Sequence, residues 1–280
     1  MTTGVTHIGV AASGRPVTPD VAERVQALAR SIWPDGRVRI SYHPQCFQEQ
    51  GHFAGSDEAR ADALVELAND PAVDALWIAR GGWGAARIVD MVLPRLKRAA
   101  HGKSYMGYSD AGTLLAALYA RGIGRQFHGP MPVDIVREGG EAAVARALRW
   151  LVDQDEESLE ASVRATDKPV AAFNLTILSH LMGTPWLPDL SGHVLMLEEV
   201  GEYVYRIDRA LAQVTSSPAV RVAAGIRLGR CSDIPPNDPD FGRDEETVAR
   251  EWCMRSGIQW LGRADIGHDV ANKVVPFGRP

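Results

Sequence analysis

The first half of the chain alternates short apolar runs with longer amphipathic stretches. The apolar runs have the length and composition of buried strands: residues 7–12, 37–43, 75–80 and 103–109. The amphipathic stretches have apolar residues at helical spacing and start or end on residues typical of helix caps: 18–33, 56–70 and 110–122. Strands that alternate with helices predict a parallel sheet covered by helices on both faces, with ligands bound at the carboxyl ends of its strands.

Residues 138–168 are polar and acidic and show no strand periodicity, so we expect an inter-domain connection there. It would separate an N-terminal α/β domain of residues 1–137 from a C-terminal domain of residues 169–280. In the second domain, the pattern predicts helices in 174–184 and near 205–217, a strand in 193–200, a Pro- and Asp-rich loop and a further helix.

Composition and charge narrow the classes of function. The chain has 280 residues, of which 45% are hydrophobic and 23% charged, enough for two ordinary domains with proper cores. Its net charge is −5 and it has no block of Lys or Arg, so we expect no nucleic-acid partner. The N-terminal residues resemble neither a signal peptide nor a membrane span, and Cys46, Cys231 and Cys253 form no disulfide or metal pattern. We therefore expect a cytoplasmic protein without a metal or another cofactor.

A candidate nucleophile lies in residues 103–122, where a predicted strand passes through Gly-Tyr-Ser-Asp directly into a predicted helix. This order is typical of an elbow that exposes a serine hydroxyl, here that of Ser109, above a helix N-terminus. The positive end of the helix would stabilise negative charge on a bound carbonyl oxygen. The alternative is that Ser109 only caps the helix, because serine is a favoured N-cap residue.

The sequence ARGGWG (79–84) follows another predicted strand. Its glycines allow close approach of the backbone to a ligand, and their N–H groups can bind an anion. If Ser109 is the nucleophile, the N–H groups of Gly82 and Asp110 are natural donors to an oxyanion. The alternative is a tight strand-to-helix turn. Arg80 is a candidate for binding a substrate carboxylate, with a structural role as its alternative.

A serine nucleophile needs a general base, and the chain has eight histidines. His268 lies in a sequence typical of a loop, which suits a catalytic histidine, whereas His128 follows the next strand of the first domain. Both remain candidates on this evidence. Glu198 and Glu199 end an apolar strand, and strand alternation places them on opposite faces, so only one is expected to orient the base. Alternatively, the glutamates pair with Arg206 and Arg209.

Seven blocks of the chain, taken in order, resemble the conserved blocks of the LD-carboxypeptidases, a serine peptidase family that includes the microcin C self-immunity proteins. They are GHFAGSDEARADAL, ARGGWGAARIVD, MGYSDAG, FHGPM, FNLTILSHLMGTPWLPDL, HVLMLEEVGEYVYRIDRAL and IGHDVANKVVPFG. The resemblance runs from about His7 to Gly278. Trp83 stands where the family usually has tyrosine, which keeps an aromatic wall and makes Trp83 a candidate for binding the substrate.

The resemblance implies a triad of Ser109, Glu198 and His268, with oxyanion donors at Gly82 and Asp110. Glu199 would then be a surface or ion-pair residue. It also implies a flavodoxin-like N-terminal domain, a smaller β-rich α/β C-terminal domain and a homodimer. The expected substrate is a murein tetrapeptide, from which terminal D-Ala is released during cell-wall recycling.

Two other functions remain open. A peptidase of the microcin-immunity type would cleave peptidyl or acylated aminoacyl-nucleotides and would need an aromatic platform for the base, for which Trp186 and Trp260 are candidates. A small-molecule-binding protein could keep the cleft without catalysis, although an intact Ser109, Glu198 and His268 argue against it.

Overall fold

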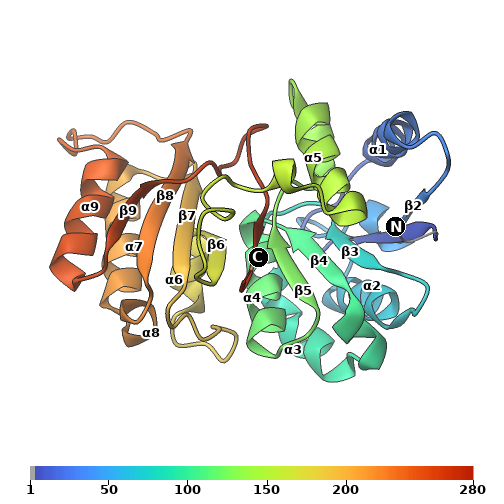
Figure 1. Cartoon of the computed structure of the whole chain (residues 1–280), viewed down its shortest axis with the longest axis horizontal. Helices are drawn as coiled ribbons and strands as arrows, with labels where there is room; N and C mark the ends of the chain where they lie inside the picture. Colours follow the sequence, from blue (N-terminus) through green and yellow to red (C-terminus); the bar gives the residue numbers. More distant parts are fainter. Residues whose placement is uncertain (1–3, 280) are drawn as a thin grey trace.

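The computed structural model describes residues 4–279. They form two sheets, each with its own helices, that lie side by side along the long axis of the molecule (Figure 1). The first sheet has the strand order β10-β5-β4-β3-β1-β2, and the second has the order β6-β7-β8-β9. The strands of the first sheet are β1 (Thr6–Ala11), β2 (Val38–Tyr42), β3 (Ala75–Ile78), β4 (Ser104–Gly107), β5 (Arg125–His128) and β10 (Val275–Pro276). Strands β1 to β5 run parallel, and β10 pairs antiparallel with β5. The order β2-β1-β3-β4-β5 is that of flavodoxin-like folds, so the predicted first fold is confirmed.

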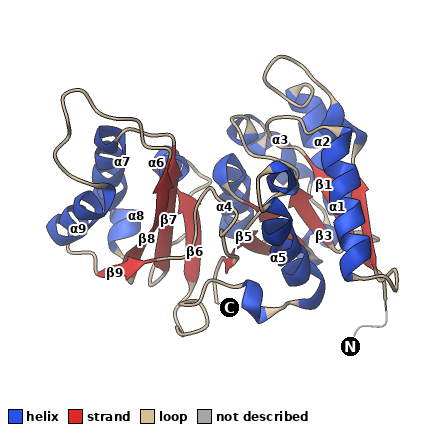
Figure 2. Ribbon diagram, turned by 90° about the horizontal axis from the view of Figure 1, so that it is seen from above, coloured by secondary structure: helices blue, strands red, loops and turns tan. Residues whose placement is uncertain are grey.

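Helices cover both faces of the first sheet (Figure 2). They are α1 (Pro19–Ile32), α2 (Asp57–Asn69), α3 (Val89–Val92), α4 (Gly112–Ala120) and α5 (Gly140–Asp153). Helices α1 and α5 pack together on one face, and α2, α3 and α4 share the apolar cluster on the other. Helix α1 shows why the pattern was readable: Thr18 is its N-cap, Pro19 opens it, and Val21, Val25 and Ala29 form one buried stripe.

Residues 138–168, expected as a connection, contain helix α5, which packs against α1. The chain then reaches the second sheet, whose strands are β6 (Val170–Asn174), β7 (Val194–Val200), β8 (Gly225–Ser232) and β9 (Trp260–Arg263), all parallel. Its helices are α6 (Leu175–Leu181), α7 (Val204–Ser216), α8 (Pro218–Arg221) and α9 (Glu245–Ser256). Short 3-10 turns complete the fold: η1 (Pro44–Phe47), η2 (Ala85–Arg87), η3 (Leu93–Arg95), η4 (Arg98–Gly102), η5 (Ser109–Ala111), η6 (Pro132–Val136) and η7 (Glu156–Ser158).

The end of the chain ties the two sheets together. After β9, the chain crosses back, adds β10 to the first sheet, and then pairs Gly278 with Val170 of the second. Two apolar clusters also extend across both domains, one of them joining helices α2 and α4 with α6 and α7. The loop between β9 and β10 is therefore held between the domains.

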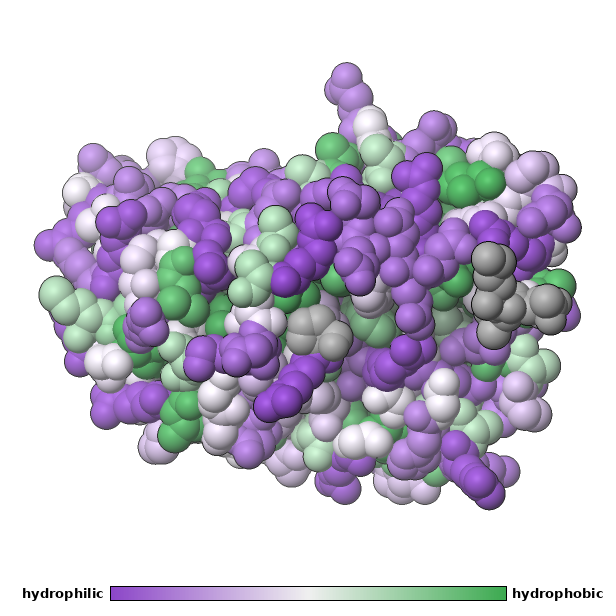
Figure 3. Space-filling model, viewed as in Figure 1, coloured by the Kyte–Doolittle hydropathy of each residue, from purple (hydrophilic) through white to green (hydrophobic). Residues whose placement is uncertain are grey.

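The face drawn in Figure 3 is mostly polar, with apolar residues scattered over it rather than joined in one large patch. Within residues 4–279, no helix has the length and apolar character needed to cross a membrane.

Candidate active site

The segment between β4 and α4 forms a tight elbow with Ser109 at its tip. Ser109 has a φ of 60°, which strains the backbone of a residue with a side chain. Gly107 makes room for the turn, because a Cβ there would lie 3.0 Å from the Cβ of Ala111 and 3.1 Å from that of Ile78. The turn η5 and helix α4 follow at once, as in the nucleophile elbows of hydrolases. Tyr108, not Ser109, is the N-cap residue of η5.

The glycine-rich loop after β3 lies against this elbow. A Cβ on Gly81 would come within 3.1 Å of the Ser109 Oγ, which is tighter than most Cβ contacts, so glycine favours this approach. Gly82 has a φ of 88°, which also favours glycine. The Asp110 carboxylate accepts a hydrogen bond of 2.8 Å from the Ala85 N–H and so ties the two loops together. Burial raises the pKa of Asp110 to about 6, against the lowering effect of that N–H group. The predicted oxyanion donors thus belong to adjoining loops.

His268 and Glu198 meet although they lie far apart in the sequence. His268 lies on the loop between β9 and β10, and its Nδ1 is joined by a hydrogen bond to Oε2 of Glu198 on β7. Glu198 is fully buried, and His268 is 8% exposed. The Nε2 atom of His268 is buried and has no partner among residues 4–279, so it is free to take a proton. Burial opposes the imidazolium, but the charge and hydrogen bond of Glu198, together with the charges of Glu199 and Asp134, outweigh burial and raise the pKa of His268.

Glu199, the next residue of β7, has other hydrogen-bond partners than Glu198. Its Oε1 accepts a hydrogen bond of 2.7 Å from the Asn174 side chain, and its Oε2 accepts bonds of 2.9 and 2.7 Å from the N–H and hydroxyl of Thr176. It is 3% exposed. The expectation of a surface or ion-pair residue is therefore wrong: Glu199 is a buried acceptor at the start of α6. Of the two suggested arginine partners, Arg206 pairs with Glu202 instead.

His128, the rival base, lies at the end of β5 behind Tyr108, with the two ring centroids 5.7 Å apart. Burial lowers the pKa of His128 to about 3, so its ring stays neutral. It is not among the side chains that line the cavity around Ser109. The geometry therefore favours His268.

A pocket of about 260 Å³ opens in front of Ser109. Five of the residues that line it are predicted site residues or a direct neighbour of one: Arg80, Gly81, Gly82, Ser109 and His268. The other seven were not predicted: Arg15, Tyr108, Met131, Val133, Asp134, Val136 and Arg137. Glu198 lies behind His268 and does not face the pocket.

The predicted aromatic residues lie elsewhere. Trp83 is 51% exposed and is not part of the pocket lining. The Trp186 indole N–H donates to Asp90 over 2.9 Å, and Trp260 lies under the guanidinium of Arg250. Neither of these two tryptophans lines the pocket of Ser109, so the structure brings no aromatic platform of the expected kind to the serine.

Tyr108, Asp134 and Arg137 hold His268 from the first domain. The ring centroid of Tyr108 lies 4.8 Å from that of His268, and the Tyr108 hydroxyl donates to the buried Asp134 carboxylate over 2.9 Å. Arg137 donates to the same carboxylate over 3.1 Å and to the backbone carbonyl of His268 over 2.6 Å. These three residues are not among the site residues predicted from the sequence. Ligands of parallel sheets bind at the carboxyl ends of the strands, so the loops that carry these residues could have been predicted. The individual side chains could not.

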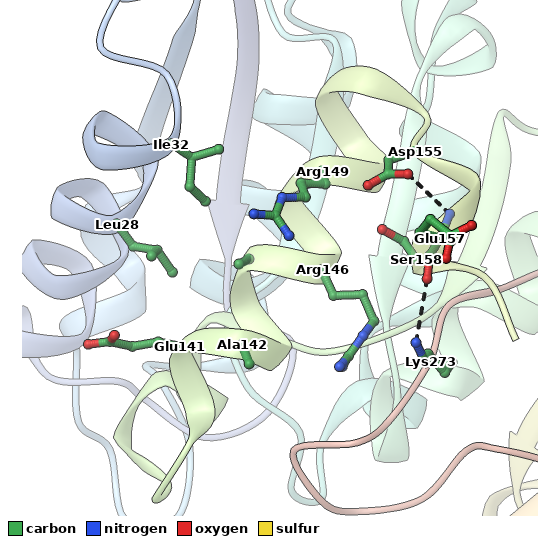
Figure 4. A pocket seen from close by; sticks show the side chains of 11 residues that line it. Leu28, Ile32, Glu141, Ala142, Arg146, Arg149, Asp155, Glu157, Ser158 and Lys273 are labelled. Carbon is green, nitrogen blue, oxygen red and sulfur yellow. Dashed lines mark hydrogen bonds between the residues drawn. The ribbon is translucent and has the colours of Figure 1, made fainter.

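One larger hollow contains none of the proposed catalytic side chains. The hollow between α1 and α5, of about 550 Å³, is lined by charged and apolar side chains such as Arg146, Arg149 and Leu28 (Figure 4). It contains none of the predicted site residues. In residues 4–279, no group of three or more His, Cys, Asp or Glu side chains is placed to hold a metal ion.

Comparison with known proteins shows which family the chain belongs to. Residues 8–129 match the model of the LD-carboxypeptidase N-terminal domain, and residues 169–280 match that of the LD-carboxypeptidase C-terminal domain. The chain belongs to the LD-carboxypeptidase family. The murein tetrapeptide carboxypeptidase of Pseudomonas aeruginosa is 28% identical to this family member, over 94% of this chain and 89% of the relative.

Solved structures give the same answer for the fold. The muramoyltetrapeptide carboxypeptidase of Oxalobacter formigenes superimposes with a TM-score of 0.78 at 25% identity, over 96% of this chain and 93% of that one. The microcin C7 self-immunity protein MccF superimposes with a TM-score of 0.79 at 18% identity, over 99% and 92% of the two chains. The second likeness concerns the fold alone.

Proposed function

We propose that this LD-carboxypeptidase family member is a serine peptidase that releases the terminal D-Ala of murein tetrapeptides by hydrolysing the bond after an L-configured centre. The observation that carries the proposal is one pocket that is lined both by a strained, half-buried Ser109 and by a His268 paired with buried Glu198. The murein tetrapeptide carboxypeptidase from Pseudomonas aeruginosa supports the choice of substrate.

In the proposed reaction, the Ser109 Oγ attacks the scissile carbonyl carbon and His268 Nε2 takes the hydroxyl proton. Glu198 stabilises the resulting imidazolium through Nδ1. The N–H groups of Gly82 and Asp110 receive the oxyanion, and each such donor contributes about 3–4 kcal/mol in comparable sites. His268 then passes its proton to the leaving amine. A water molecule, activated by the same histidine, hydrolyses the acyl-enzyme and regenerates Ser109.

The substrate assignment is tested by incubating the purified protein with a murein tetrapeptide and measuring the products by mass spectrometry. We expect a tripeptide and free D-Ala, and no turnover by Ser109→Ala. A parallel incubation uses an acylated aminoacyl-nucleotide. Cleavage of the nucleotide alone would replace the proposed substrate with that of the microcin-immunity type. Binding of the tetrapeptide without cleavage would favour the non-enzymatic alternative.

The pocket favours the tetrapeptide, because neither Trp186 nor Trp260 lies beside Ser109 to stack on a nucleobase. A role in cell-wall peptide recycling in the cytoplasm follows from the proposed substrate. The homodimer implied by the family resemblance stays a prediction, and sedimentation of the purified protein measures it.

A further inference from the structure

Arg15 lies in the loop after β1, which packs against the glycine-rich loop after β3. The Arg15 N–H donates to the Gly81 carbonyl over 3.4 Å. A Cβ added to Gly82 would come within 2.6 Å of Arg15 Cδ, so the arginine stem occupies the space that any other residue at position 82 would need. A Cβ on Gly14 would likewise lie 2.6 Å from the Gly82 carbonyl oxygen. The Arg15 side chain is therefore part of the wall that also carries a proposed oxyanion donor.

This wall adjoins the proposed nucleophile. A Cβ added to Gly81 would meet Ser109, and one added to the next residue, Gly82, would meet Arg15. Arg15, Arg80 and Ser109 line the same pocket. A substrate whose scissile carbonyl lies at Ser109 in this pocket therefore also meets Arg15 and Arg80.

The pocket has an uncompensated positive charge. Of its three arginines, Arg137 is paired with the buried Asp134. Arg15 and Arg80 have no carboxylate oxygen within 4.0 Å among residues 4–279. Partial burial and the charge of Arg15 both lower the pKa of Arg80. Two guanidinium groups held together without a carboxylate are repulsive in the free protein, and an anion between them removes the repulsion.

The position of Arg15 and Arg80 after two strands of the first sheet also indicates a binding site for a ligand. In the order β2-β1-β3-β4-β5, the chain changes direction between β1 and β3. Ligands of such sheets bind in the crevice at the carboxyl ends of the strands at this switch point. Arg15 follows β1 and Arg80 follows β3, so the arginine pair occupies that crevice.

We propose that Arg15, together with Arg80, binds the free α-carboxylate of the residue that is released, and so restricts the enzyme to the chain terminus. This inference rests on the proposed function and adds a specificity-determining residue to it. A peptide that continued beyond the leaving residue would place an uncharged amide between the two arginines. Such a substrate would leave both cations without a counterion and would be bound less well.

The experiment compares a murein tetrapeptide with a free terminal carboxylate and the same peptide carrying a terminal amide. Both are assayed for kcat and KM with the wild type, Arg15→Ala, Arg80→Ala and a matched control, Arg30→Ala, which removes an exposed arginine of α1. We expect the wild type and Arg30→Ala to prefer the free acid. Each pocket variant should lose about 10- to 100-fold in kcat/KM on the free acid and change little on the amide.

An equal loss on both peptides would overturn the carboxylate role and indicate that Arg15 stabilises the oxyanion. Equal cleavage of both peptides by the wild type would also overturn it while leaving the peptidase activity intact. Failure to cleave either peptide would instead reject the proposed function.

Binding of both peptides to Ser109→Ala, measured by calorimetry, tests the arginine pair without turnover. Here Ser109→Ala/Arg15→Ala should lose the preference for the free acid, and an unchanged preference would contradict the proposal. An aminoacyl-adenylate analogue tests the other source of an anion. If only its binding depends on Arg15, the arginines bind phosphate chemistry and the carboxylate assignment is wrong.

Discussion

Glu198 and Glu199 are consecutive residues of β7, yet their carboxylates belong to separate hydrogen-bond systems. Glu198 bonds to the His268 ring, whereas Glu199 accepts hydrogen bonds from Asn174 and Thr176 at the start of α6. Strand alternation predicts that neighbouring side chains diverge, and the pairing of β7 with β8 is irregular between Leu197 and Glu199. The two glutamates are therefore both buried and adjacent in the chain, but they have different expected roles.

Glu198→Gln should lower kcat by about 10⁴-fold with little change in Tm, because the amide keeps the size but loses the charge that stabilises the imidazolium. Glu199→Gln should instead lower the free energy of unfolding by about 1–3 kcal/mol, because an amide donor would face the donors of Asn174 and Thr176. Steady-state kinetics and thermal unfolding of both variants measure this. If Glu199→Gln abolishes turnover while Glu198→Gln does not, the orienting carboxylate has been misassigned.

Ser109→Ala and His268→Ala should each lower kcat by about 10⁴-fold or more, and the double variant should be little worse, because triad members act as a unit. His128→Ala is the control, since it changes a buried histidine that does not line the pocket. It should lower stability and leave kcat of the folded fraction largely unchanged. If the loss of kcat in the Ser109→Ala/His268→Ala double variant equalled the product of the two single losses, the two residues would not share one proton transfer.

The pH dependence of kcat/KM should have an acidic limb set by His268. The base must be neutral, so activity falls when the pH drops below its pKa. The Glu198 carboxylate raises that pKa, so the midpoint of the limb should lie above the ordinary value of 6.5. In Glu198→Gln the residual activity should show a midpoint shifted to lower pH. A midpoint that does not move would mean that another group sets the limb.

Much of the first domain could be predicted because its signals are local. Helix α1 has its cap, its proline and its buried stripe within one segment, and the predicted and observed bounds differ by one residue at each end. Strand β6 was missed, because Val170–Asn174 contains two alanines, which have weak strand propensity, and forms only by pairing with β7. Strand β8 contains two glycines and was missed for a similar reason.

In the candidate site, too, some residues could be predicted from local sequence and others could not. Ser109 and Gly82 lie in loops whose glycines and strand-to-helix order are visible in the sequence. The pairing of Glu198 with His268 spans 70 positions and depends on the chain crossing back after β9, which no local pattern encodes. Arg15 and Asp134 face the pocket only because the loops after β1 and β5 converge there. Such contacts follow from topology and become visible once the strand order is known.

Tyr108 gives the last prediction, because its hydroxyl links the ring that packs on His268 to the buried Asp134. Tyr108→Phe keeps the ring but removes this hydrogen bond, so the phenyl group is free to shift against the imidazole. We expect kcat to fall about 10-fold or more with KM nearly unchanged, since small displacements of a base are costly. Tyr105→Phe is the matched control: this tyrosine is equally buried, its hydroxyl donates to the Ala100 carbonyl over 2.9 Å, and it lies outside the pocket. Both variants should lose about 1 kcal/mol of stability, but only Tyr108→Phe should lose kcat. Equal kinetics of the two variants would make the Tyr108–Asp134 bond a purely structural contact.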